Sequence, residues 1–208
     1  SDGFNVSRGV QADIDEDHYR QSIERIQQYI HAGDCYQINL AQRFSATFSG
    51  DPLEAYTRLR ERSPTPFSAY LEVPGGALLS LSPERFIEVR EGRVETRPIK
   101  GTRPRGQSAD EDHALAQELL DCNKDRAENL MIVDLLRNDL GRSCKPGSIR
   151  VPELFSLESY PNVHHLVSSV TGQLRDDCDA IDLLMRAFPG GSITGAPKIR
   201  AMQIIEEL

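Results

Sequence analysis

The segment FSAYLEVPGGALLSLSPERFIEVREGRVETRP, residues 67–98, decides the fold class of this chain. Its residue pattern is that of short strands, which are expected at 67–71, 77–81, 85–90 and 93–98. Gly75-Gly76 and Glu91-Gly92 interrupt the pattern, and glycine at such points is typical of turns. The segment therefore predicts several consecutive strands joined by turns.

Helices and further strands are predicted on both sides of this segment. Apolar residues at helical spacing predict helices over 17–32, 51–62, 110–122, 124–138 and 179–187. Further strands are predicted at 35–48, 149–154 and 163–174. The elements lack the alternation of βαβ units, so we predict an α+β domain built on antiparallel sheet. The polar residues 1–15 are predicted to form a linker or an entering arm.

Composition limits the class of protein. A chain of 208 residues with 38% hydrophobic residues can bury a core without disulfides. Its formal net charge is -8 and its basic residues are scattered, so nucleic acid is not an expected partner. No apolar run is long enough to span a membrane, and residues 1–10 lack the pattern of a signal peptide. Four widely spaced cysteines fit a cytoplasmic protein with reduced thiols.

Two stretches contain a candidate catalytic residue. Lys100, in RPIKGT, could be a nucleophile if a dry pocket lowers its pKa from the usual value of about 10.4. From chemistry alone, a solvated lysine at a strand end is the commoner case. Glu84, in SPER, could be a general acid or base, or half of an ion pair with a nearby arginine.

A row of carboxylates indicates a metal site. Asp121, Asp125 and Glu128 would share one helix face if a single helix runs through this stretch. The same face continues into Ile132 and Leu135, which suggests that it turns inward. Carboxylates in such a place are good Mg²⁺ ligands. The alternative is a polar helix rim at the solvent.

A glycine-rich loop and a histidine pair complete the candidates. The loop PGGSITGAPK (189–198) enters a helix and could present N–H groups to an anion, or be a flexible connector. It is not a phosphate loop of the G-x-x-x-x-G-K type, because Ala196 follows Gly195. His164 and His165 would point to opposite faces of a strand, so only one could face a site.

Six stretches in order along the chain then carry a resemblance: AGDCYQINLAQRF (32–44), LSPERF (81–86), TRPIKGTRPRG (96–106), AENLMIVDLLRNDLGR (127–142), VHHLVSSVTG (163–172) and FPGGSITGAPK (188–198). Together they resemble the chorismate-binding enzymes. The resemblance implies a two-sheet antiparallel β-sandwich with flanking helices, in incomplete form. Residues 1–208 would be a partial catalytic domain, without the N-terminal subdomain and the C-terminal end that the family has. Such a fragment alone is expected to be inactive.

The resemblance also implies roles for individual residues. Glu128 would be a ligand of the Mg²⁺ that holds the ring carboxylate of chorismate, with Asp125 close by. Glu84 would be the general acid/base that helps to expel the C4 hydroxyl. His165, rather than His164, would be the active-site histidine.

Three further residues would contact the substrate according to the resemblance. Gly101 and Thr102 would contact a substrate carboxylate. Ser192 would lie in the substrate loop.

Lys100 decides between branches of the family. Anthranilate-forming members have alanine at this position, so the resemblance implies the branch that aminates chorismate at C4 through a covalent Lys100 intermediate. Gln37 stands where water-using members have a lysine. The implied product is 4-amino-4-deoxychorismate, for para-aminobenzoate and folate synthesis, with ammonia from a glutamine amidotransferase subunit. The alternatives are an anthranilate synthase component, an inactive module that docks a glutaminase, and a plain α+β structural domain, which would not explain six ordered motifs.

Overall fold

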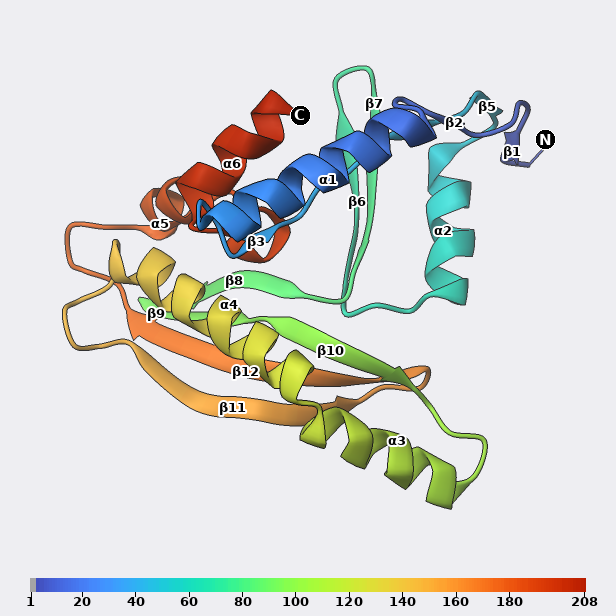
Figure 1. The fold of residues 1–208 in the computed structure, drawn as a ribbon. Coiled ribbons are helices and arrows are strands. Elements are labelled where there is room, and N and C mark those ends of the chain that lie inside the picture. The colour runs from blue at the N-terminus through green and yellow to red at the C-terminus, as the bar shows by residue number, and fades with distance from the viewer. Residues whose placement is uncertain (1–2) are drawn as a thin grey trace. The chain divides into compact units, whose positions relative to one another are not determined.

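The chain folds into two compact units. The computed structural model describes residues 3–208. The first unit contains the residues up to Glu84 together with Ile199–Leu208, and the second contains Arg85–Lys198. Figure 1 labels most of the elements of both units. Within the described residues, no helix has both the length and the apolar content needed to cross a membrane.

Two helices from opposite ends of the sequence pair in the first unit. Helix α1 (Glu16–Ala32) begins at Asp15, whose carboxylate accepts a hydrogen bond from the His18 N–H, and it ends at Gly33 in the left-handed conformation. Helix α6 (Lys198–Glu207) lies beside it (Figure 1). The Tyr29 hydroxyl donates to the Glu207 carboxylate at 2.7 Å, which joins the two helices. The helix predicted over 17–32 is confirmed.

The remaining elements of the first unit are a helix, a hairpin and short ladders. Helix α2 (Pro52–Arg62) begins at Asp51, which accepts a hydrogen bond from the Leu53 N–H. Strands β6 (Phe67–Val73) and β7 (Gly76–Ser82) form an antiparallel hairpin with Gly75 at the turn. The strands and turn that residues 67–82 predict are therefore present.

The strand predicted at 35–48 is wrong as one continuous element. The structure has only short pieces there: β3 (Gln37–Ile38), β4 (Phe44–Ser45) and β5 (Phe48–Ser49). Phe44 and Phe48 are 58% and 51% exposed, so the apolar alternation has no buried face to stabilise a longer strand.

The predicted N-terminal arm supplies the partners of these pieces. Strand β1 (Asn5–Val6) pairs with β5, and β2 (Gln11–Ala12) pairs with β4. The first two residues of the predicted arm lie outside the described residues.

A sheet of five antiparallel strands forms the centre of the second unit. Its strands are β8 (Arg85–Arg90), β9 (Arg93–Arg97), β10 (Ile99–Pro104), β11 (Arg150–Ser159) and β12 (Val163–Gln173). Strand β12 pairs with β10 along its first half, with β9 along its second half, and with β11 over most of its length. Strand β8 pairs with β9 through the turn Glu91-Gly92, where both residues have positive φ. The predicted antiparallel α+β class is confirmed.

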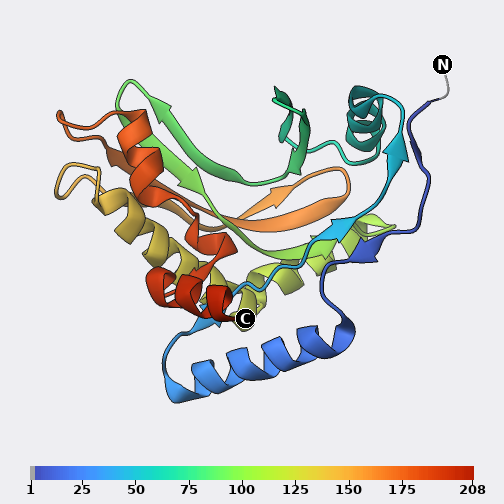
Figure 2. The ribbon, with the colours of Figure 1, turned by 90° about the horizontal axis from the view of Figure 1, so that it is seen from above.

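Helices cover one face of this sheet. Helices α3 (Ala109–Asp121) and α4 (Asn123–Gly141) lie along it in Figures 1 and 2. On β9, Val94 and Thr96 are buried, whereas the alternate residues Glu95 and Arg97 are half-buried. The apolar core on the helix side consists of Val94, Val133, Leu140, Cys144, Val170, Leu174 and Leu183.

The C-terminal part of the second unit is a helix followed by a loop. Helix α5 (Ala180–Ala187) begins at Asp179, which caps it with hydrogen bonds from two backbone N–H groups. The loop 188–197 follows it and contains the short helix η1 (Gly191–Ile193) and the strand residues of β13 (Gly195–Ala196).

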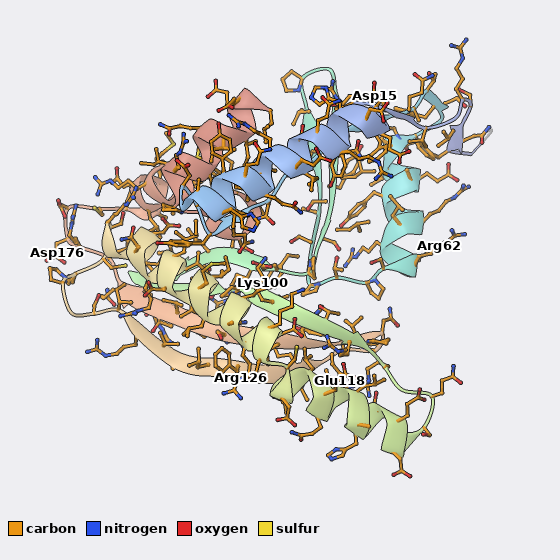
Figure 3. All side chains as sticks on the ribbon, in the orientation of Figure 1. Asp15, Arg62, Lys100, Glu118, Arg126 and Asp176 are labelled. Carbon is orange, nitrogen blue, oxygen red and sulfur yellow. The ribbon has the colours of Figure 1, made fainter. Side chains whose placement is uncertain are left out.

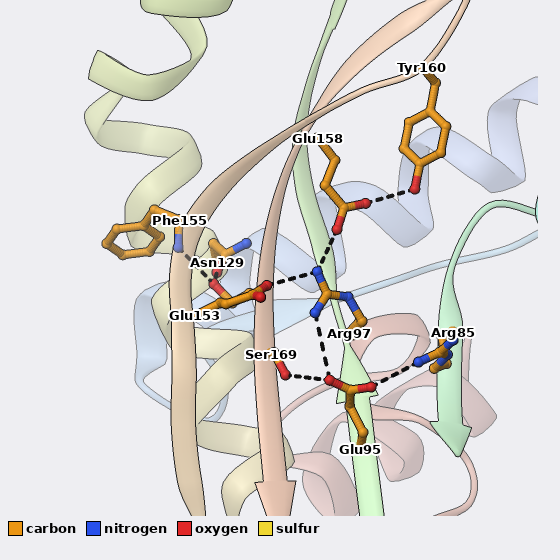
Figure 4. A network of polar contacts seen from close by, with 10 residues as sticks. Arg85, Glu95, Arg97, Asn129, Glu153, Phe155, Glu158, Tyr160 and Ser169 are labelled. Carbon is orange, nitrogen blue, oxygen red and sulfur yellow. Dashed lines mark hydrogen bonds and ion pairs between the residues drawn. The ribbon is translucent and has the colours of Figure 1, made fainter.

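Asn129 ties helix α4 to the sheet. Its side chain is fully buried and donates to the Leu166 carbonyl at 3.2 Å. The Ser168 hydroxyl donates to Asn129 Oδ1 at 2.5 Å and accepts from the Phe155 N–H at 3.1 Å. Figure 4 shows Asn129 next to Phe155 of β11. One amide thus connects the helix to both β12 and β11.

We expect Asn129→Ala to lower the free energy of unfolding by about 2–3 kcal/mol, because it leaves the buried Leu166 carbonyl and Ser168 hydroxyl without their partner. Urea unfolding of the intact protein measures this change. Asn138→Ala, at an exposed position of the same helix, is the control and should stay within about 0.5 kcal/mol of wild type. Equal effects of the two substitutions would contradict the anchoring role.

Candidate active site

A β-bulge shapes the strand that carries three of the predicted site residues. Ile99 pairs with Val167, and Thr102 pairs with His165. Two residues, Lys100 and Gly101, therefore lie opposite the single residue between Val167 and His165. Such a bulge bends the strand and changes the direction of the side chains next to it.

Gly101 allows β10 to approach the helices closely. Its φ is +96°, which residues with a side chain rarely adopt. A Cβ atom at this position would lie 2.9 Å from Asp125 Cβ and 2.9 Å from Leu119 Cδ1. Only glycine satisfies both constraints, so the bulge brings the backbone beside Lys100 into contact with Asp125 of α4.

Lys100 reaches the loop 188–197. Its half-buried side chain projects from β10 (Figure 3), and Nζ lies 3.5 Å from the carbonyl oxygen of Ser192. The loop itself rests on α4, because a Cβ atom on Gly191 would overlap the side chain of Leu135. Lys100 and Ser192, predicted from separate motifs, are therefore brought together.

Thr102 and His165 form a second contact pair. The Thr102 hydroxyl and His165 Nδ1 are 2.9 Å apart across the β10–β12 ladder. Burial lowers the pKa of His165, although the nearby Glu158 carboxylate acts in the opposite direction. The ring of Tyr160 lies 5.7 Å from that of His165. His165 is thus a mostly buried, neutral imidazole at neutral pH.

Asp125 combines a cationic neighbour with an unused oxygen. Arg103 Nη1 lies 3.2 Å from Asp125 Oδ2, a distance typical of an ion pair. The same oxygen is buried and has no hydrogen-bond partner among residues 3–208. The contact is therefore a charge interaction without good hydrogen-bond alignment, because Arg103 Nη1 donates to the Thr102 carbonyl at 3.0 Å and Nε donates to Glu118 at 2.8 Å. Figure 3 places Glu118 on α3.

Glu128 lies one helical turn after Asp125. Its side chain is 43% exposed, and Lys124 Nζ is 3.8 Å away. Mg²⁺ commonly takes one or two protein carboxylates and completes its shell with water and substrate. Asp125 Oδ2 and Glu128 are oxygen donors that fit this part of a Mg²⁺ shell. No group of three or more His, Cys, Asp or Glu residues suited to a metal occurs in residues 3–208.

Asp121, the third carboxylate of the predicted row, is not part of that face. Helix α3 ends at Asp121 and α4 begins at Asn123, because Cys122 between them has extended backbone angles. Asp121 accepts a hydrogen bond from Gln117 within α3. The single helix that the prediction required is not formed. The face of α4 beyond Glu128 does turn inward, since Ile132 is fully buried.

Glu84 belongs to the first unit and His164 to the second. Glu84 is the last residue of the first unit and is half-buried, and its N–H donates to the Ser82 hydroxyl at 3.2 Å. His164 is 2% exposed, and its ring nitrogens contact the Ser159 hydroxyl at 2.8 Å and Asp112 at 3.0 Å. A contact at each ring nitrogen is typical of a structural histidine.

A charged network on the other face of the sheet was not predicted from the sequence. Arg97 contacts Glu158 at 2.5 Å and Glu153 at 2.8 Å (Figure 4). The Tyr160 hydroxyl donates to Glu158 at 2.7 Å. Burial acts to raise the pKa of Glu158, but Tyr160 and Arg97 lower it overall. The network therefore holds Tyr160 beside His165.

The lowered pKa of His165 has a consequence for stability. Because the unfolded histidine, with a pKa near 6.5, takes up a proton more readily than the folded one, stability is lost as the pH falls through about 6.5. We expect the intact protein to lose more stability between pH 8 and pH 5 than its His165→Asn variant. Because one proton is involved, the slopes of unfolding free energy against pH should differ by less than about 1.4 kcal/mol per pH unit between the two proteins. Urea unfolding across this range measures it, and identical slopes would contradict the assignment.

Comparison with known proteins places the chain in a family. A family model described as chorismate binding enzyme matches residues 1–208. Aminodeoxychorismate synthase component 1 of Klebsiella aerogenes is 55% identical over 205 residues, which are 99% of this chain and 46% of the relative. The protein of the same name from Bacillus subtilis (strain 168) is 50% identical over 197 residues, 95% of this chain and 42% of the relative.

A solved structure agrees with this placement. Anthranilate synthase component I of Streptococcus pneumoniae superposes with a TM-score of 0.86 at 36% identity, over 96% of this chain and 44% of that protein. The chain thus spans less than half the length of each of these three proteins. Because the family model matches the whole sequence and the fold is shared, the chain belongs to the family of chorismate-binding enzymes.

Proposed function

We propose that the protein containing this chain aminates chorismate at C4 and forms 4-amino-4-deoxychorismate, a precursor of para-aminobenzoate in folate synthesis. The observation that carries the proposal is Lys100, an amine on a bulged strand beside the loop 188–197. Relatives that are 50% and 55% identical and named aminodeoxychorismate synthase component 1 support it.

Lys100 acts as the nucleophile in this proposal. Its Nζ forms a bond to C2 of chorismate while the ring double bonds shift and the C4–O bond breaks. The hydroxyl takes up a proton and leaves as water, and the amine loses a proton as the C–N bond forms. Ammonia then bonds to C4 and loses a proton, the double bonds shift back, and the bond between C2 and Nζ breaks as Nζ takes up a proton. The sum is chorismate plus ammonia giving the amino product plus water.

The residues around Lys100 hold the substrate. Gly101 and Thr102 bind a substrate carboxylate, where the bulge leaves backbone groups of β10 available. The neutral His165, bonded to Thr102, can donate or accept one hydrogen bond without adding charge. Ser192 supports Lys100 from the loop through its carbonyl oxygen.

Asp125 and Glu128 would hold Mg²⁺, as the orphaned Asp125 oxygen and the adjacent exposed Glu128 suggest. When bound, Mg²⁺ supplies a positive charge that attracts the ring carboxylate of chorismate. Asp125 also remains close to Arg103, so its own charge is partly balanced before the metal arrives.

The leaving hydroxyl and the ammonia need further groups. By family resemblance, Glu84 supplies the proton that the C4 hydroxyl needs. Ammonia comes from a glutamine amidotransferase subunit, a partner for which the name component 1 of the relatives is the support.

The product and the Lys100 adduct test the function. Intact protein given chorismate, Mg²⁺ and ammonium should form 4-amino-4-deoxychorismate, and without ammonium it should show an adduct on the Lys100 peptide by mass spectrometry. Lys100→Ala should lose the adduct and at least about tenfold in turnover, the factor that corresponds to about 1.4 kcal/mol in the barrier. Lys145→Ala, which removes a half-exposed lysine of the same unit, is the control. Formation of anthranilate, or full turnover without any adduct, would contradict the proposal.

Glu128→Gln keeps the shape of the side chain and removes its charge, so we expect the Mg²⁺ concentration for half-maximal turnover to rise at least about tenfold. Calorimetric titration of Mg²⁺ with substrate present provides a second measurement. Asp134→Asn, an exposed carboxylate on the same helix, should change neither value. An unaltered Mg²⁺ dependence in Glu128→Gln would exclude this carboxylate as a ligand.

A further inference from the structure

Lys198 and Asp139 form a buried ion pair at the end of the loop 188–197. Lys198 Nζ lies 2.6 Å from Asp139 Oδ2, and the two side chains are only 10% and 2% exposed. Burial raises the pKa of Asp139, although Lys198 acts to lower it. Desolvation of a buried ion pair can outweigh the attraction between its charges. The presence of this pair therefore calls for an explanation other than stability.

The ammonium of Lys198 also holds the other end of the loop. Its Nζ donates to the carbonyl of Ala187 at 2.8 Å, the last residue of α5. Lys198 is the first residue of α6, so the ten loop residues lie between Ala187 and Lys198. The Lys198 ammonium therefore joins the two ends of the loop. The same group binds α4 through Asp139. A single side chain thus closes the loop and fastens it to a helix.

A second contact on α4 fixes the middle of the loop. Gly191 packs against Leu135, where no Cβ atom would fit. Leu135 precedes Asp139 by four residues, so both contacts lie on one face of α4. Within the loop, the Thr194 hydroxyl donates to the Gly190 carbonyl at 3.0 Å. The Ser192 carbonyl, next to Gly191 in this loop, lies 3.5 Å from Lys100 Nζ.

The pair is not arranged for stability alone. Asp139 Oδ1 is buried and has no hydrogen-bond partner among residues 3–208, so only one of its two oxygens is used. A buried carboxylate oxygen without a partner lowers stability, so the pair is not optimised for stability. The single bond goes instead to the residue that closes the loop.

We propose that Lys198 is a positioning residue, whose ammonium closes the loop 188–197 onto Asp139 and thereby sets the Ser192 carbonyl beside the amine of Lys100. The inference deepens the proposed function, since it gives Lys198 a role in placing the reactive lysine. Lys198 itself does not touch the reacting atoms.

The experiment separates positioning from stability by removing both charges at once. Lys198→Met leaves Asp139 as an uncompensated buried charge and is expected to lower the melting temperature. The double variant Lys198→Met/Asp139→Leu removes that charge as well, so its melting temperature should recover most of the loss. The matched control is Lys145→Met/Asp176→Leu. It removes an ion pair of the same types at a more exposed place in the same unit, where Figure 3 labels Asp176.

Three readouts are applied to these variants of the intact protein. Hydrogen exchange of the amides at 190–195 reports on the loop, and the rate of Lys100 acetylation by an amine-directed reagent reports on its surroundings. Both are measured without chorismate. The third readout is kcat/KM for chorismate with ammonium as the nitrogen source.

The double variant should show about tenfold faster exchange in the loop and several-fold faster acetylation of Lys100. Its kcat/KM should be about 100-fold lower, as expected for a misplaced reactive group. The control pair should match wild type in all three. Gly191→Ala, which forces the loop away from Leu135 without touching the buried charges, should reproduce the loop and Lys100 effects.

Wild-type exchange and acetylation in the double variant would overturn the inference, as would faster exchange with unchanged acetylation and kcat/KM. A wild-type protein without chorismate turnover would instead refute the proposed function. In that case, the exchange and acetylation rates still decide whether Lys198 positions Lys100.

Discussion

The second unit depends on the close contact between strand β10 and helix α4 at Gly101. The strand must bend there, because Lys100 and Gly101 together face one residue of β12. The bend brings the backbone so near to Asp125 that no side chain fits between them. This contact brings the Lys100 amine, the Asp125 carboxylate and the Thr102 hydroxyl into one region of the unit. Each of these groups contacts a different partner. A regular strand would keep the pairing with β12 but would lose this arrangement.

The two faces of the sheet in the second unit carry different kinds of polar groups. Toward the helices, polar side chains are few and paired, as in the contact of Asn129 with Ser168. On the other face, arginines and glutamates form a connected network around Arg97. Partly exposed ion pairs contribute little stability singly, but a network restricts the rotamers of its members. Its effect at the site is to hold Tyr160 and, through it, the surroundings of His165.

Local sequence patterns predicted most of the helices and strands, because caps, turns and apolar spacing act over a few residues. Asp15, Gly33 and Glu91-Gly92 mark the ends of elements by chemistry that the sequence displays. The strand at 35–48 was wrong since alternation alone does not reveal whether a face will be buried. Cys122 breaks the carboxylate row where the two helical patterns over 110–122 and 124–138 meet, so the face that the row required is divided between two helices.

The candidate site was predicted mainly through ordered motifs, and its long-range contacts were not. Lys100 and Ser192 are 92 positions apart, and Lys198 and Asp139 are 59 apart. Nothing in the spacing of such residues predicts which of them meet. The same is true of the bulge, since Gly101 could equally have belonged to a turn. Only the folded structure shows why glycine is required at position 101: its φ is positive, and Asp125 leaves no room for a side chain.

The central position of β12 has a consequence for synthesis on the ribosome. Strands β8, β9 and β10 leave the ribosome before β12, and their hydrogen-bonding edge stays open until residues 163–173 follow several seconds later, at about 5–20 residues per second. An open apolar edge at that stage would invite pairing with other nascent chains. Helices α3 and α4 emerge in the interval and can cover the apolar face early. The arginines and glutamates of β8 and β9 leave the uncovered face charged, and the cost of removing these charges from water opposes association with other copies until the partner strand arrives.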